Sequence, residues 1–219
     1  MTQEHLIFTQ QDHLILRSYF SVADGVAEFC GDSCEVVIHN LEHLDHSVVK
    51  IVNGHLSGRQ AGAPISDVTL TFLNQMIENP EQRSLCYFAK NKRGEDFKST
   101  LNAIVNENNN IIGLFCINFY LNMPLLSVIQ SLLPSEKAKN DNISETFVEN
   151  TEELMLLALN DAKKNVYADT SISSSNKNKE IIALLYKKGI FNLKDAVVII
   201  AGHLGISKNT VYMHLRNIK

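Results

Sequence analysis

The stretch NLKDAVVIIAGHLGISKNTVYMHLRNIK, residues 192–219, predicts two short helices separated by a tight turn. The first helix has apolar residues at the i, i+3, i+4, i+7 spacing of one buried stripe: Val197, Ile200, Ala201 and Leu204. Gly205 can end that helix in the left-handed conformation, and Ser207 can cap the next helix. This arrangement is typical of a helix-turn-helix, which places its second helix in the major groove of DNA.

The second helix has an inward stripe of Val211, Leu215 and Ile218. We expect its outward residues to contact double-stranded DNA: Lys208, Asn209, Thr210, Tyr212, Met213 and Arg216. A three-helix bundle with another function can also contain an Ala-x3-Gly turn. The outward face argues against that alternative, because no acidic residue occurs from Ser207 to the end of the sequence.

Positive charge is concentrated in this end of the chain. Residues 176–219 hold eight Lys or Arg against two acidic residues, a net charge of +6, whereas the whole sequence has a net charge of −4. A local excess of this kind favours binding to phosphates. Lys187 and Lys188, upstream of the turn, are therefore expected to contact the DNA backbone.

Composition limits the remaining possibilities. A length of 219 residues fits one or two domains, and no apolar run approaches the ~20 residues that span a bilayer. The N-terminus lacks the features of a secretory signal, so we expect a cytoplasmic protein with no membrane contact. Four cysteines (30, 34, 86 and 116) should then be reduced, and they do not suggest a disulfide framework.

The N-terminal two thirds of the chain predict a sheet with helices. An amphipathic helix is expected near residues 8–30, two strands at 34–39 and 47–52, and a helix from about 66 to 77. Three further strands follow, at 85–91, 97–105 and 111–121, with short polar hairpin turns between them. Helices are predicted at 123–133 and 145–166, and the Ser/Asn/Lys-rich stretch 168–179 reads as a flexible linker.

Two strands, a helical segment and a three-stranded meander have the order of a PAS domain. CEVVIHNL, SVVKIVNGHLSGRQAGAPISD and FKSTLNAIVNENNNIIGLFCINFYLN resemble the YheO-like PAS domain of bacterial regulators. The C-terminal region, from KEIIALLYKKG to the end, is similar to the helix-turn-helix of the same DauR-type family. His43 and His46 depart from the family's pattern. The resemblance implies a DNA-binding transcriptional regulator with a sensor-like N-terminal domain.

The expected architecture is therefore α+β: a PAS-like domain with a five-stranded antiparallel sheet, followed by an all-α helix-turn-helix domain. We assign residues 1–133 to the PAS-like domain, 134–175 to a connecting helix and linker, and 176–219 to the DNA-binding domain. One helix-turn-helix contacts few base pairs, so a homodimer is expected. Candidate contacts are the N-terminal helix, the sheet face carrying Phe115, Ile117 and Phe119, and a stripe of Leu154, Leu157 and Ala158.

Polar residues near the sheet are candidates for binding an unidentified small-molecule effector. They are Asn53, His55, Ser57, Arg59, Ser99, Cys116 and Asn118. Arg59 would suit a carboxylate or phosphate, although an ion pair between Arg59 and Asp67 is an equally open interpretation. Buried Asn118 requires a hydrogen-bond partner. Cys116 is expected to be a small core residue with a raised pKa rather than a redox thiol.

Other kinds of site are less well supported by the pattern. His39, His43 and His46, with Cys30 and Cys34, could suggest zinc, but Cys34 and His39 would lie at opposite ends of one strand, so we interpret the histidines as surface residues. Ser57 lacks the setting of a catalytic nucleophile. We expect no cofactor, no metal and no enzymatic activity. The alternative to a sensor is a PAS-like domain that acts only in dimerisation or protein interaction.

Overall fold

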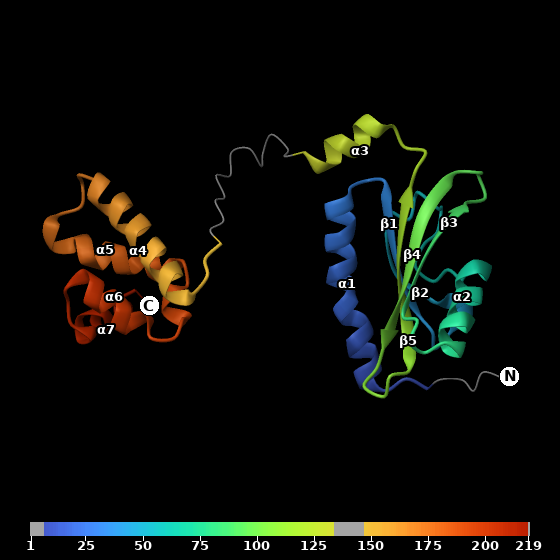
Figure 1. Ribbon diagram of the computed structural model, residues 1–219, viewed down its shortest axis with the longest axis horizontal. Coiled ribbons are helices and arrows are strands. Elements are labelled where there is room, and N and C mark those ends of the chain that lie inside the picture. The colour runs from blue at the N-terminus through green and yellow to red at the C-terminus, as the bar shows by residue number, and fades with distance from the viewer. Residues whose placement is uncertain (1–6, 134–146, 219) are drawn as a thin grey trace. The chain divides into compact units, whose positions relative to one another are not determined.

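The computed structural model describes residues 7–133 and 147–218, which fall in two compact units (Figure 1). One unit lies within Met1–Asp141 and contains a sheet, and the other lies within Asn142–Lys219 and is helical. We call them the sheet unit and the helical unit and describe each by itself. No helix in the described parts of the chain has the length and apolar character needed to cross a membrane.

The sheet unit has five antiparallel strands in the order β2-β1-β5-β4-β3. The strands are β1 (Cys34–Asn40), β2 (Val48–Val52), β3 (Ser84–Lys90), β4 (Asp96–Val105) and β5 (Ile111–Tyr120). Helix α1 (Gln10–Cys30) precedes them and α2 (Asp67–Glu78) separates β2 from β3. The predicted order of helix, two strands, helix and three strands is confirmed, and with it the PAS-like α+β fold.

The two faces of the sheet are covered by different elements (Figure 1). Helix α1 contacts β1, β2 and β5 on one face, and there the ring of Tyr19 lies 6.0 Å from that of Phe115. Phe115 is therefore buried beneath α1, and Ile117 and Phe119 are half-buried. The prediction that these three residues form an open dimer surface is wrong for Phe115, because α1 already covers it.

Gly113 allows the close approach of α1 to the sheet. A Cβ atom at this position would collide with the side chain of Leu16 on α1 and with the carbonyl oxygen of His39 on β1. Leu16 is buried and belongs to the main core of the unit. Only glycine leaves room for this contact, because any larger side chain would force the helix away from the strand.

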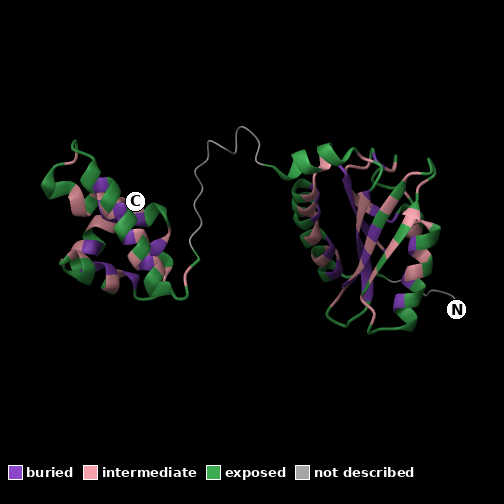
Figure 2. Ribbon diagram, turned by 45° about the horizontal axis from the view of Figure 1, so that its top comes forward, coloured by how far each residue is buried: buried purple, intermediate pink, exposed green. Residues whose placement is uncertain are grey.

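Helix α3 (Leu125–Leu132) follows β5 and buries none of its residues. Figure 2 shows α3 mostly in the exposed colour, and within the helix only Val128 is half-buried. Its large apolar side chains Leu125, Leu126, Ile129 and Leu132 are between 45% and 74% exposed. A helix with this surface has apolar area available for another partner.

Over residues 147–218, the helical unit contains four α-helices and two short 3₁₀ turns. They are α4 (Thr151–Ala168), η3 (Ser174–Asn176), α5 (Lys177–Lys187), η4 (Ile190–Asn192), α6 (Ala196–Leu204) and α7 (Lys208–Arg216). Met155, Leu159, Ala162 and Val166 form the inward stripe of α4 and pack against α5 and α6. A second cluster joins Ile182, Ala201 and Val211.

The region predicted to be a connection differs from that expectation. Helix α4 is part of the core of the helical unit, and Leu157, predicted to lie in a stripe for dimerisation, is 41% exposed while Ala158 packs toward that core. The stretch predicted as a flexible linker contains η3 and the start of α5, and Ile172 packs against the same core. Its polar composition concealed one apolar residue that attaches it to the bundle.

Candidate functional site

A cavity of about 710 Å³ opens on the face of the sheet opposite α1. Its floor is formed by side chains from β1, β3, β4 and β5, and its other wall by the loop after β2 and the first turn of α2. The paired strands explain why the floor residues meet. Val37 lies opposite Cys116 and Ser99 opposite Asn118, and side chains of directly paired residues point to the same face.

Five of the seven predicted ligand residues line this cavity: Ser57, Arg59, Ser99, Cys116 and Asn118. Asn53 and His55 do not. Asn53 has a positive φ of 56° in the turn after β2, and its side-chain amide donates a 2.8 Å hydrogen bond to the carbonyl oxygen of Cys34. His55 is exposed to solvent. Asn53 therefore holds the turn in place, and the neighbouring turn directs His55 outward.

A polar network connects three of these lining residues to Glu35. The hydroxyl of Ser99 donates to Oδ1 of Asn118 (2.7 Å), and Nδ2 of Asn118 donates to Oε1 of Glu35 (2.9 Å). The hydroxyl of Ser57 donates to the other carboxylate oxygen of Glu35. Glu35 is only 1% exposed. The sequence interpretation missed Glu35, although its pairing opposite Asn118 supplies a hydrogen-bond partner for this half-buried amide.

The contacts of Arg59 decide between its two interpretations, an ion pair with Asp67 and a position on the wall of a ligand site. Its guanidinium donates a 2.7 Å hydrogen bond to the carbonyl oxygen of Pro64, and it forms no ion pair with Asp67 or with any other residue in the described ranges. The ion-pair interpretation is therefore not what the structure shows. Arg59 fastens the loop to itself and remains on the cavity wall.

His39 is a second residue that sequence reasoning misplaced. It was interpreted as a surface histidine, but it is 1% exposed, lines the cavity, and has Nδ1 2.8 Å from the hydroxyl of Ser47. Burial and the nearby charge of Arg59 lower the pKa of His39 to about 3, so its ring is neutral at physiological pH. The alternation of β1 was the available signal, because His39 shares a face with Val37.

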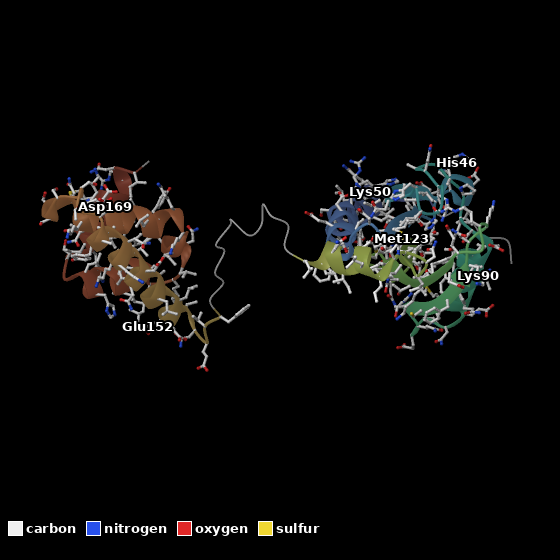
Figure 3. The ribbon with its side chains drawn as sticks, turned by 90° about the horizontal axis from the view of Figure 1, so that it is seen from above. His46, Lys50, Lys90, Met123, Glu152 and Asp169 are labelled. Carbon is white, nitrogen blue, oxygen red and sulfur yellow. The ribbon has the colours of Figure 1, made fainter. Side chains whose placement is uncertain are left out.

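His43 and His46 are exposed, as predicted, and Figure 3 shows His46 at the surface of the sheet unit. Within residues 7–133 and 147–218, no three His, Cys, Asp or Glu side chains gather closely enough to hold a metal ion. Cys116 is buried, and this burial raises the pKa of its thiol to about 12, which fits the expected core residue.

The helical unit contains the predicted turn between two helices. Gly205 ends α6 with φ 65° and ψ 30°, and the backbone N–H of Ile206 donates 3.1 Å to the carbonyl oxygen of Ala201. Ser207 then caps α7 by accepting a 3.1 Å hydrogen bond from the N–H of Thr210. Val211 is fully buried against Ala201 and Ile182, so the opposite side of α7 faces solvent.

The residues predicted to contact DNA lie on that outward side, with two qualifications. Lys208, Asn209, Tyr212, Met213 and Arg216 are exposed. Thr210 is half-buried, and its hydroxyl lies 2.8 Å from that of Ser207 in the helix cap. Lys187 is exposed, whereas the ammonium of Lys188 forms an ion pair with Asp161 of α4.

Beside α7 lies an open depression of about 590 Å³ whose lining includes Asn209, Tyr212 and Arg216. The rings of Tyr186 and Phe191, from the end of α5 and from η4, form its other side. Three predicted DNA-contacting residues are thus gathered on one concave surface.

Comparisons with known proteins agree with this division. Residues 9–134 match the model of the YheO-like PAS domain, and residues 158–216 match that of an HTH domain. The protein YheO of Escherichia coli (strain K12) is 39% identical over 212 residues, covering 97% of this chain and 88% of its own. The transcriptional regulator DauR of Pseudomonas aeruginosa is 23% identical over 209 residues, covering 93% and 94%.

The crystal structure of a PAS domain from Colwellia psychrerythraea aligns with 45% of this chain and 93% of its own, at 18% identity and a TM-score of 0.33. The HTH match begins within α4, which the structure also places in the helical unit. The chain belongs to the family of YheO-like PAS domain proteins and carries a C-terminal HTH domain.

Proposed function

We propose that this protein is a DNA-binding transcriptional regulator whose sheet unit binds a small molecule. The observation that supports DNA binding is the turn from α6 to α7, which leaves one face of α7 exposed and free of acidic residues. Membership of a family in which DauR is named a transcriptional regulator supports it. The cavity over the sheet supports the second half, since its volume and its mixture of apolar and polar walls suit a small ligand.

The functional DNA-binding unit in this proposal is longer than residues 176–219. Helix α4 supplies the stripe against which α5 and α6 pack, so a fragment beginning at residue 176 would expose the apolar residues of that core. We therefore place the boundary of the DNA-binding domain before α4.

Two copies are proposed to act together on DNA, because one recognition helix reads too few base pairs for strong selectivity. The apolar residues still exposed on α1 (Leu14, Val22 and Phe29) and along α3 are the surfaces available for this contact. These exposed residues also favour the alternative function, in which the sheet unit serves only for association and holds no ligand. Mass spectrometry of small molecules released from the purified chain separates the two.

The experiment that tests DNA reading starts with selection of preferred sequences from random duplexes by the full chain. Asn209 is exposed near the start of α7 and suits an adenine edge. Asn209→Ala should cost about 1–3 kcal/mol on the selected sequence and little on random DNA. Equal losses on both would refute its role in base reading. Light scattering of the same preparations measures the predicted dimer.

A further inference from the structure

The guanidinium of Arg59 has hydrogen-bonding capacity left over at the cavity. One N–H is used by the carbonyl oxygen of Pro64, and no other side-chain hydrogen bond or ion pair of Arg59 occurs within the described residues. Its charge acts on His39, Tyr87 and Cys116, which belong to three different strands of the floor. The positive charge therefore lies over the cavity rather than away from it, with a planar set of donors to offer.

His39 supplies a second, independent polar group. Its Nδ1 is matched with Ser47, and its Nε2 makes no hydrogen bond in the parts of the chain that the structure describes. No side-chain nitrogen or oxygen sealed from solvent in those parts lacks a partner. Nε2 must therefore open on the cavity that His39 lines, although the residue as a whole is 99% buried from solvent. A buried ring nitrogen without a protein partner indicates a place for a ligand atom.

The charged side chains around the cavity indicate which net charge a ligand should carry. Glu35 already accepts hydrogen bonds from Ser57 and Asn118, and His39 is neutral. Lys90 is paired with Asp96 at 2.7 Å and is exposed at the edge, as is Lys92. Lys92 and Asp67 also line the cavity, both at exposed positions and with opposite charges, so they offset each other. Among the described cations of the lining, Arg59 alone is half-buried, and a single negative charge offsets it, whereas a dianionic phosphate would need a second cation beside it.

Much of the cavity lining is apolar. It includes Val37, Ile65, Tyr87, Ala89 and Phe97, and the ring of Tyr87 packs against that of Phe72 at 4.7 Å. Such walls gain free energy by covering an apolar body and disfavour a ligand that is polar throughout.

From these contacts, and resting on the proposed sensor function, we infer that the cavity binds a small monocarboxylate with an apolar body, its carboxylate at Arg59 and within reach of His39. The probes are 3-phenylpropionate and hexanoate, each compared with its neutral amide. Phenyl phosphate tests the dianion.

The readout is the rate at which N-ethylmaleimide labels Cys116, which lines the cavity, relative to exposed Cys86 in the same chain. A ligand at about ten times its Kd should slow labelling of Cys116 about tenfold and leave Cys86 unchanged. Arg59→Gln should remove this protection. Arg83→Gln is the matched control, since Arg83 is also half-buried and also donates to a single carbonyl oxygen, that of Asn109. Continued protection of Cys34, buried elsewhere in the core, would show that both variants are folded.

Protection by a carboxylate but not by its amide, lost in Arg59→Gln alone, would support the inference. Protection by no probe, equal protection by the amides, protection by phenyl phosphate alone, or an unaltered response in Arg59→Gln would overturn it. DNA affinity measured on the same samples separates the two proposals. Binding of DNA without carboxylate protection would overturn the inference alone, whereas protection without DNA binding would support it and count against the regulator.

Discussion

The sheet unit and the helical unit bury different kinds of side chain. In residues 7–133 of the sheet unit, seven polar or charged residues are buried: Asp12, Ser33, Glu35, His39, Ser47, Thr69 and Ser99. In residues 147–218 of the helical unit, every buried side chain is apolar. A buried polar group lowers stability unless it is hydrogen-bonded, so it requires a precise environment. In the sheet unit these hydrogen-bonded polar groups lie close to a cavity. In the helical unit the polar side chains are at the surface, where those of α7 are accessible to another molecule.

The largest expected effect comes from placing a charge in the apolar core. Val211 of α7 is 0% exposed and packs with Ala201 of α6 and Ile182 of α5, so Val211→Asp should destabilise the helical unit by more than about 4 kcal/mol and abolish DNA binding. Val198→Asp is the control, because Val198 is 45% exposed on α6. Circular dichroism measures the lost helix. All four cysteines lie in the sheet unit, and continued protection of Cys34 and Cys116 would show that this unit folds independently; their exposure would contradict it.

Within the sheet unit, the thiols of Cys116 and Cys86 should differ in reactivity. Cys116 is buried and has a pKa raised to about 12, so only about one in ten thousand of its thiols is ionised at pH 8. Cys86, on edge strand β3, is exposed. We expect Cys116 to react at least about a hundredfold more slowly than Cys86, as measured by mass spectrometry of labelled peptides. Similar rates would mean that the cavity floor opens readily.

The two units also differ in how far the sequence predicted them. Strands β1 and β5 were predictable because they are short runs rich in apolar and β-branched residues, and the turn at Gly205 because a left-handed helix end favours glycine. Those are local signals. The position of His39 depends on which face of β1 is covered, and the role of Glu35 depends on Asn118, 83 residues away. Alternation along β1 places His39 on the same face as Val37, but no local pattern shows that this face is covered or that Glu35 meets Asn118.

The errors have a related physical cause. Asn53 and His55 were grouped with Ser57 and Arg59 because they are neighbours in sequence, but a turn sends neighbouring side chains in different directions. The sequence pattern also assigns α4 to the connecting region 134–175. Its stripe of Met155, Leu159 and Ala162 has helical spacing, yet only the position of α5 and α6 shows that it is the buried one.

A smaller effect concerns the buried histidine. The folded pKa of His39 is about 3, against 6.5 for an ordinary histidine, so between these pH values the unfolded chain binds a proton that the folded chain does not. Stability of the sheet unit should therefore fall as pH falls below about 6.5, by about 1.4 kcal/mol per pH unit, and this dependence should vanish above that pH. Urea unfolding, followed by pulse labelling of Cys34, measures it. His39→Gln should flatten the dependence between pH 5 and 6.5, and an unchanged slope would contradict the assignment.

The smallest expected effect lies on the outside of the helical unit, where Asp161 holds Lys188. Both side chains are about half exposed, so Asp161→Asn should change stability by less than about 1 kcal/mol. It should instead release Lys188 for a phosphate and steepen the dependence of DNA affinity on salt by up to about 0.9 in the log–log slope. Glu152→Gln, which neutralises an exposed acid in the first turn of α4 (Figure 3), controls for charge alone. If both variants steepen the salt dependence equally, the cause is reduced repulsion between the protein and DNA rather than the release of Lys188. Lys188→Ala in the otherwise wild-type chain provides the contradicting outcome. If it lowers the log–log salt slope by about 0.9, Lys188 already contacts a DNA phosphate, and the ion pair with Asp161 does not prevent that contact.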